Sequence, residues 1–160
     1  YRRLGVTESA YLLDDMYAEI IADGHHLPLE LIRLICKLKD NSKICLVTDC
    51  LKVSGSGEVT GNVGATKFIV EDGVCKLADH SALAGSIATM DRLIKTMTSS
   101  DVEVPLFDVI RMISETPSKI MNVYDRKGSL EKGKDADIIL IDKDYEVRGV
   151  MAMGRIVKSI

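Results

Sequence analysis

Apolar and polar positions along the first third of the chain follow the rhythm of a strand, a helix and a second strand. Residues 16–22 form a short apolar run, as a buried strand does. After Pro28, apolar side chains recur every three or four positions across residues 29–39, which predicts an amphipathic helix with one face on a sheet. Residues 43–47 form the next apolar run. The order implies two parallel strands joined by a crossover. The apolar positions of the helical stripe are Leu31, Ile32, Ile35 and Leu38.

The remaining pattern predicts a β-hairpin, further helices and a terminal layer of strands. Glycines separate short β-like runs within residues 55–80, which indicates a hairpin excursion. From residue 128 onward, turns alternate with apolar runs. We therefore expect one unit over residues 1–127 and strands of a separate small β-sandwich over residues 128–160. Helical spacing is expected in residues 86–97, 105–114 and 117–123.

Polar residues follow both predicted parallel strands. The first strand runs into Asp23 and His26, and the second runs into Asp49. Sites of barrels and doubly wound sheets gather at the carboxyl ends of parallel strands. A closed eight-stranded barrel takes about 250 residues. The 160 residues present here can therefore hold only part of one.

Charge and composition narrow the range of partners. The formal net charge is −3 with acids and bases interspersed, Trp is absent and aromatic residues make up 4% of the chain. This leaves neither a basic field nor stacking surfaces for nucleic acid. No apolar run approaches the roughly 18 to 20 residues that cross a bilayer, and the first residues lack the apolar stretch of a signal peptide. We expect a cytoplasmic protein without membrane or nucleic-acid partners.

The four cysteines show no CxxC spacing, and three lie inside apolar stretches. Buried thiols are therefore favoured over a zinc cluster or a disulfide framework. The cysteines are Cys36, Cys45, Cys50 and Cys75.

Four short motifs carry more specific information. They are Ile20-Ile21-Ala22-Asp23-Gly24-His25-His26, Cys45-Leu46-Val47-Thr48-Asp49, Leu83-Ala84-Gly85-Ser86 and Gly128-Ser129-Leu130-Glu131-Lys132-Gly133-Lys134-Asp135-Ala136-Asp137. In this order they resemble the N-acetylglucosamine-6-phosphate deacetylase family of amidohydrolases over essentially the whole chain. The last motif is weak for function, because many amidohydrolases carry such a turn before their β-sandwich. The resemblance implies an α/β fold, the carboxy-terminal part of a TIM-type (β/α)8 barrel with its last strands, plus part of a small β-sandwich.

The resemblance also implies an activity and a role for Asp49. Family members use a metal-bound water to hydrolyse N-acetylglucosamine 6-phosphate to glucosamine 6-phosphate and acetate. An aspartate after the eighth barrel strand takes the water proton and then protonates the leaving amine, and Asp49 occupies the matching position. One group beside the reacting water must serve as base and then as acid. The alternative is that Asp49 caps a turn after a strand, as Asp often does.

His26 matches a family histidine that contacts the substrate, and its alternative is a structural strand-end histidine. The backbone of Asp23, Gly24 and His25 is expected to line the pocket. The side chain of His25 receives no role, because the family commonly has an apolar residue there. Neighbouring strand residues point to opposite faces, so we do not assign the His25-His26 pair to a metal.

A loop and an arginine complete the predicted substrate site. Leu83, Ala84 and Gly85 match a loop whose main chain touches the sugar, and Gly85 would allow a close approach; the alternative is an ordinary helix start. Arg2 matches by spacing an arginine that binds the sugar phosphate, often across a dimer interface. A solvated charge is its alternative. An amino-sugar phosphate substrate and a homodimer are therefore expected.

The metal ligands of the family, a glutamate and two histidines, are expected upstream of Tyr1. We thus expect a divalent metal of the zinc or iron class, no metal ligand in this chain, and no activity of the chain alone. Cys50 replaces the usual alanine, so the sugar preference stays open. One alternative is another amidohydrolase of the dihydroorotase, dipeptidase or deaminase type. The other is a non-catalytic domain that retains the fold.

Overall fold

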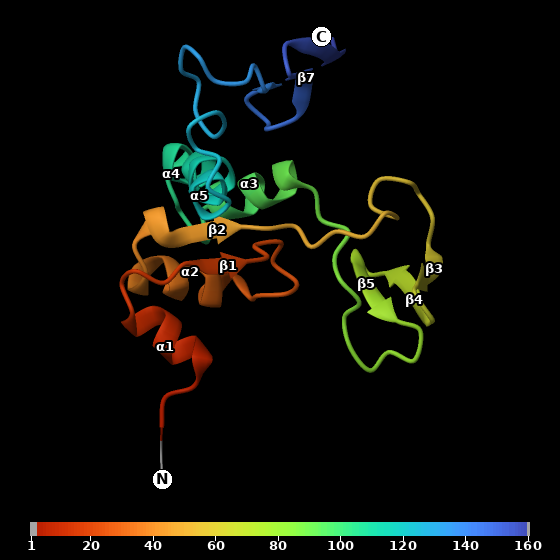
Figure 1. Ribbon diagram of the computed structural model, residues 1–160. Helices are drawn as coiled ribbons and strands as arrows, with labels where there is room; N and C mark the ends of the chain where they lie inside the picture. The colour runs from red at the N-terminus through yellow and green to blue at the C-terminus, as the bar shows by residue number, and fades with distance from the viewer. Residues whose placement is uncertain (1–2, 160) are drawn as a thin grey trace.

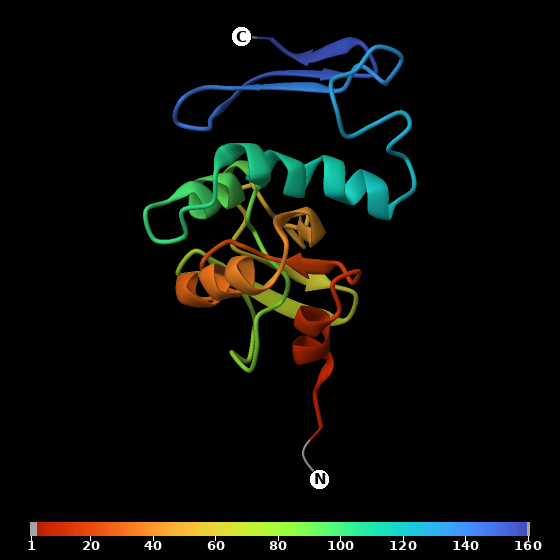
Figure 2. The same ribbon diagram turned by 90° about the vertical axis from the view of Figure 1, so that its left-hand side faces the viewer.

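The computed structural model describes residues 3–159, and Figures 1 and 2 show it from two sides. A small parallel sheet with its helices forms the centre of the molecule. One antiparallel sheet lies beside this centre, and another lies at the end remote from the N-terminus. The elements are α1 (Val6–Leu12), β1 (Ala18–Ile20), α2 (Leu29–Leu38), η1 (Asn41–Lys43), β2 (Ile44–Leu46), β3 (Thr60–Val63), β4 (Thr66–Glu71), β5 (Val74–Leu77), α3 (Met90–Thr98), α4 (Leu106–Ile113), α5 (Glu115–Ile120), β6 (Ile138–Ile141), β7 (Val147–Ala152) and β8 (Arg155–Lys158).

The predicted strand, helix and strand form the centre. β1 and β2 pair in parallel, with Ile20 opposite Leu46, and α2 connects them as predicted. The predicted apolar stripe of α2 is only half buried. Ile32 and Ile35 are 0% and 3% exposed, whereas Leu31 and Leu38 remain 36% and 53% exposed. A two-stranded sheet is too narrow to cover the full stripe.

Three further helices pack on this sheet and close the core. α3 and α4 each bury two or more apolar side chains, and both contact the central cluster around β1, β2 and α2. α5 begins at Glu115, two residues earlier than the predicted start at Pro117. Proline is tolerated in the first turn, where its missing N–H would have no helical partner. The buried apolar side chains of α3 and α4 are Leu93, Ile94, Met97, Val109 and Met112.

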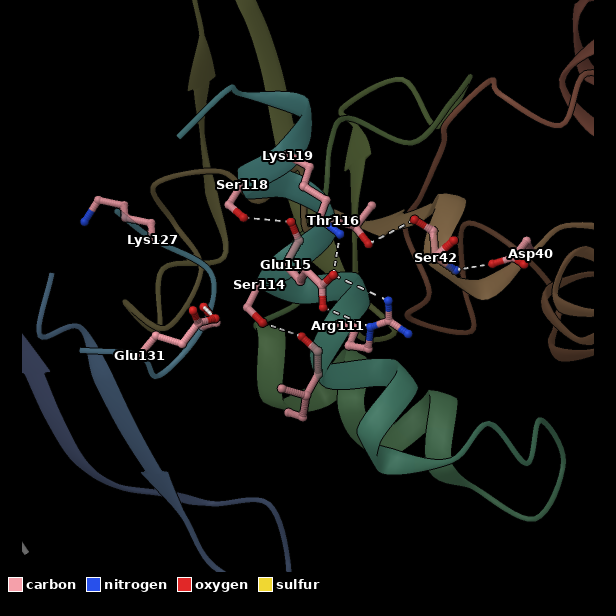
Figure 3. Close-up of polar contacts among 12 residues, drawn as sticks. Asp40, Ser42, Arg111, Ser114, Glu115, Thr116, Ser118, Lys119, Lys127 and Glu131 are labelled. Carbon is pink, nitrogen blue, oxygen red and sulfur yellow. Dashed lines mark hydrogen bonds and ion pairs between the residues drawn. The ribbon is translucent and has the colours of Figure 1, made fainter. Parts of the chain in front are cut away.

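Figure 3 shows how serines complete the joint between α4 and α5. The Ser114 hydroxyl donates to the carbonyl of Ile110 at 2.6 Å, and the Ser118 hydroxyl donates to the carbonyl of Glu115 at 2.7 Å. Both bonds satisfy backbone acceptors where the helix geometry changes. α4 and α5 therefore follow one another with only Ser114 between them.

The predicted start of α3 at residue 86 is wrong. α3 begins at Met90, and Ser86 instead forms a parallel bridge with Cys50. The backbone groups of Ser86 are used by this pairing: its N–H donates to Asp49 at 2.9 Å, and its carbonyl accepts from Leu51 at 2.9 Å. Because the N–H and carbonyl of Ser86 both pair with a neighbouring segment, its carbonyl is not available for the first hydrogen bond of an α-helix.

The predicted hairpin is β4 with β5, and β3 adds a strand that the sequence pattern did not predict. β3 contains Gly61, a residue that weakens strands unless close packing requires it. Such packing exists here, because a Cβ on Gly61 would lie 2.6 Å from the Phe68 ring. The hairpin thus belongs to an antiparallel, three-stranded sheet in which β4 is the central strand.

The terminal strands form a second antiparallel sheet, in the order β6, β7 and β8. This confirms the predicted strands after residue 128, and Figure 2 shows the sheet beyond α4 and α5. At the opposite end, α1 was not predicted and buries no residue of its own. The buried Lys39 holds it, because its ammonium donates to the carbonyls of Ala10 at 2.9 Å and Leu13 at 2.5 Å. Across residues 3–159, no helix combines the length and apolar character needed to span a bilayer.

Candidate active site

The candidate site lies where β1 and β2 end side by side. The N–H of Val47 donates to the carbonyl of Ile20 at 3.0 Å, so the residue after β2 is still paired with the last residue of β1. The segments carrying His26 and Asp49 therefore leave the sheet at adjacent points (Figure 1). This confirms the predicted neighbouring strand ends. That both side chains face one cavity stays a prediction.

The loop after β1 is organised by the carboxylate of Asp23, a buried residue. One oxygen accepts the N–H groups of His25 and His26, each at 2.9 Å, and the other lies 2.9 Å from Nδ1 of His26. Burial alone would raise the pKa of Asp23. The hydrogen bonds from the His26 and His25 backbones and from the His26 ring outweigh burial, and they hold this pKa below its ordinary value.

This geometry corrects the expectation that His25 and His26 are neighbouring strand residues. His25 and His26 lie in a bent loop beyond β1, not in the strand, so strand alternation does not decide where their rings point. Gly24 has φ +78°, a left-handed conformation that glycine adopts without strain. The turn at Gly24 brings both following N–H groups back onto Asp23.

Arg92 of α3 ties this loop to the antiparallel sheet. Its guanidinium donates to the carbonyl of Asp23 and to that of Gly73, both at 3.4 Å. Gly73 lies in the turn between β4 and β5. Three elements that are distant in sequence thus meet beside the end of β1. No motif pointed to Arg92, because its contacts are to main-chain atoms only.

Asp49 follows β2 with an exposed side chain and a left-handed backbone, φ +48°. Residues other than glycine adopt this conformation infrequently, although Asp tolerates it better than most. Such outliers gather at functional sites when the surrounding structure holds them in place. The exposed carboxylate and the held backbone fit a residue that acts on something outside the chain.

The segment from Leu83 to Ser86 supplies that support through its main chain and the hydroxyl of Ser86. Leu83 bridges Lys76 of β5, and Ser86 bridges Cys50, so the segment connects the antiparallel sheet to the end of β2. Gly85 has φ +73°, and a Cβ there would lie 3.2 Å from the carbonyl oxygen of Asp49. The buried Ser86 hydroxyl donates to the carbonyl of Thr48. The backbone on both sides of Asp49 is therefore fixed.

Two expectations, the phosphate contact of Arg2 and the place of the metal ligands, are not tested by the described residues. Arg2 lies outside the described residues. Among residues 3–159, no three His, Cys, Asp or Glu side chains gather in a way that could hold a metal ion. The described residues therefore do not form a metal donor set by themselves.

Comparison with known proteins places this geometry in a family. Residues 3–157 match the Amidohydrolase family. The chain belongs to this family. As an amidohydrolase it is similar to N-acetylglucosamine-6-phosphate deacetylase of Haemophilus influenzae, with 36% identity over 96% of this chain and 40% of the relative. The Bacillus subtilis enzyme of the same name is 31% identical over 98% of this chain and 39% of the relative.

Solved structures agree with the sequence relatives. The crystal structure of N-acetylglucosamine-6-phosphate deacetylase from Pasteurella multocida superposes with a TM-score of 0.90 and 30% identity, over 98% of this amidohydrolase chain and 40% of that one. The mixed α/β fold is therefore shared. The chain spans about 40% of the length of the relatives that it matches.

Proposed function

We propose that this chain supplies the acid-base carboxylate and part of the sugar site of an enzyme that deacetylates N-acetylglucosamine 6-phosphate. The products are glucosamine 6-phosphate and acetate. The likeness to deacetylases over nearly the whole chain supports this substrate class. The observation that carries the proposal is the exposed Asp49, held in a left-handed backbone beside the loop that contains His26.

Asp49 performs both proton transfers in this proposal. Its carboxylate accepts a proton from the attacking water and returns it to the nitrogen of the breaking amide bond. The amine can then leave as a neutral group, because the proton reaches it as the C–N bond breaks. His26 contacts a substrate oxygen, and the backbone of the segment from Leu83 to Gly85 lies along the sugar.

Membership of the amidohydrolase family implies a divalent metal in general. The described residues do not form its donor set. We propose that its ligands belong to the part of the relatives that this chain does not match, and that the metal is of the zinc or iron class. A bound ion would polarise the amide carbonyl and favour ionised water.

The same proposal assigns the architecture and assembly of the intact protein. Residues 1–127 would hold the last strands of a TIM-type barrel, and residues 128–160 would form part of a small β-sandwich. Ile139, Ile156 and Val157 of the terminal sheet are exposed, and an apolar sheet of this kind is stable once another layer covers it. Arg2 would bind the sugar phosphate in a homodimer.

Steady-state kinetics of Asp49→Asn in the full-length, metal-loaded protein test the central assignment. The amide copies the shape of the carboxylate but cannot accept and return a proton, so kcat should fall by at least about 10²-fold. Asp72→Asn is the matched control, because Asp72 also has a left-handed backbone, φ +53°, at the exposed turn between β4 and β5. If Asp49→Asn kept a near-normal kcat, the proton would be carried by another group.

The choice of substrate separates the alternatives. Turnover of N-acetylglucosamine 6-phosphate should be compared with that of its C4 epimer, with dihydroorotate, with dipeptides and with purine nucleosides. Preference for one of the last three would identify another amidohydrolase activity. No turnover of any of them by the metal-loaded protein would favour a non-catalytic domain.

A further inference from the structure

We infer that Asp23 is a positioning residue, which fixes the imidazole of His26 with a proton on Nδ1 and leaves Nε2 as the ring nitrogen that meets a ligand. The identity of that ligand rests on the proposed function. The protonation pattern of the ring does not, since it follows from contacts within the loop.

The hydrogen-bond inventory of Asp23 leads to this conclusion. Its first oxygen accepts two backbone N–H groups, and its second oxygen faces Nδ1 of His26 at 2.9 Å. An ionised carboxylate can only accept hydrogen bonds. The proton of the Asp23–His26 contact must therefore belong to the imidazole. Burial raises the pKa of Asp23, but the same hydrogen bonds lower it by more. The resulting low pKa supports the ionised form.

With Nδ1 bonded to Asp23, Nε2 is the ring nitrogen of His26 that is available to a ligand. In a neutral ring with a proton on Nδ1, Nε2 is a hydrogen-bond acceptor; in the cation, Nε2 becomes a donor. The Asp23 side chain is only 3% exposed, while 16% of the His26 side chain remains accessible. The ring thus has one edge held by a buried carboxylate. A sugar hydroxyl or a phosphate oxygen would meet the other edge.

Asp23→Asn separates positioning from the architecture of the loop. The two N–H groups of His25 and His26 still require an acceptor, so the amide oxygen should keep that place. The amide NH2 group then faces Nδ1 of His26 and can only donate. This arrangement favours the opposite tautomer, with the proton on Nε2, while the turn itself is preserved.

Long-range 1H–15N NMR of histidine-labelled protein, at a pH where the rings are neutral, reads the tautomer directly. The chain has three histidines, so the signals are few. His26 should carry its proton on Nδ1 in the wild type and on Nε2 in Asp23→Asn. His25 is an internal control, because Asp23 receives its backbone N–H but not its ring, and its tautomer should stay unchanged. A wild-type His26 protonated on Nε2 would overturn the inference even if the variant did not fold.

Kinetics of the full-length protein then test the functional meaning. Asp23→Asn should raise KM for N-acetylglucosamine 6-phosphate by about tenfold, the effect of one lost or reversed hydrogen bond, with a smaller change in kcat. A switched tautomer without any change in KM would show that Nε2 does not meet the substrate. Absence of turnover in the wild type would reject the proposed function and leave the NMR result standing.

Discussion

Gly128→Ala tests whether the motif that begins at Gly128 is a structural joint. Gly128 has φ +87° and lies against α5 and its N-cap residue. A Cβ at this position would overlap the Ser118 hydroxyl, approach the Ser118 Cβ to 2.8 Å and reach the Ser114 carbonyl oxygen at 3.0 Å. The Ser118 hydroxyl donates to the carbonyl of Glu115 (Figure 3), and the Ser114 carbonyl belongs to the backbone and accepts the N–H of Ser118. Neither neighbour can move without disturbing the helix.

The expected loss of stability has two parts. A left-handed backbone costs an L-residue about 1–2 kcal/mol. Overpacking against a fixed neighbour costs about 1–3 kcal/mol more. Gly133→Ala is the matched control, because Gly133 has a similar φ of +98° but no atom within 4 Å of the added Cβ. It should show only the first part.

Thermal unfolding followed by circular dichroism compares the two variants. The melting temperature changes by about 2–4 °C per kcal/mol in a protein of this size, so Gly128→Ala should melt roughly 2–12 °C below Gly133→Ala. Equal melting temperatures would mean that the close approach at Gly128 is relieved at no cost. The structural explanation of this motif would then be wrong.

Three further predictions concern other parts of the chain. Lys39→Met should release α1 and speed hydrogen exchange of residues 6–12, since both carbonyl contacts are lost; unchanged exchange would show that α1 is held otherwise. Glu115→Gln should lower the melting temperature at neutral pH, because hydrogen bonds from Arg111 and Lys119 lower the pKa of Glu115 from 4.5 to about 2. That stabilisation, about 1 kcal/mol after solvent screening, is complete above pH 4.5 and is lost toward pH 2. The difference in melting temperature between the variant and the wild type should therefore disappear toward pH 2, and a difference that does not change with pH would refute the explanation. Cys50 is exposed, so mass spectrometry should find it alkylated before the other thiols, and simultaneous labelling would contradict the burial. Cys36 is partly buried, and Cys45 and Cys75 are buried. Burial also raises the pKa of these three thiols, which makes them less reactive.

The sequence predicted the parts of the fold that depend on local pattern. The apolar runs of β1 and β2, and the stripe of α2 between them, report burial directly, because side chains repeat with the period of the element. β3 was missed because it contains Gly61, whose place in a strand depends on the ring of Phe68 on the neighbouring strand. The start of α3 was misplaced for a similar reason: Ser86 bonds to a segment far away in sequence.

The candidate site divides in the same way. The places of Asp49 and His26 after neighbouring strands could be predicted, since each follows an apolar run and belongs to a recognisable motif. The role of the Asp23 carboxylate could not, because it depends on the turn at Gly24 that returns two N–H groups to it. Arg92 could not be found either, since an arginine that bonds only carbonyl groups leaves no pattern in the sequence.

The two halves of the candidate site are held by different means. A side chain, Asp23, orients the loop of His26, whereas the backbone of Asp49 is held by a main-chain hydrogen bond from Ser86 and by the close approach of Gly85. A group that must accept and release a proton benefits from a side chain without competing partners, because each such bond would favour one charge state. Fixing Asp49 through its backbone leaves its carboxylate available for the proton exchange that we propose. The segment from Leu83 to Ser86 therefore contributes by its path through the fold, and a side chain at Gly85 would act on Asp49 before it reached any substrate.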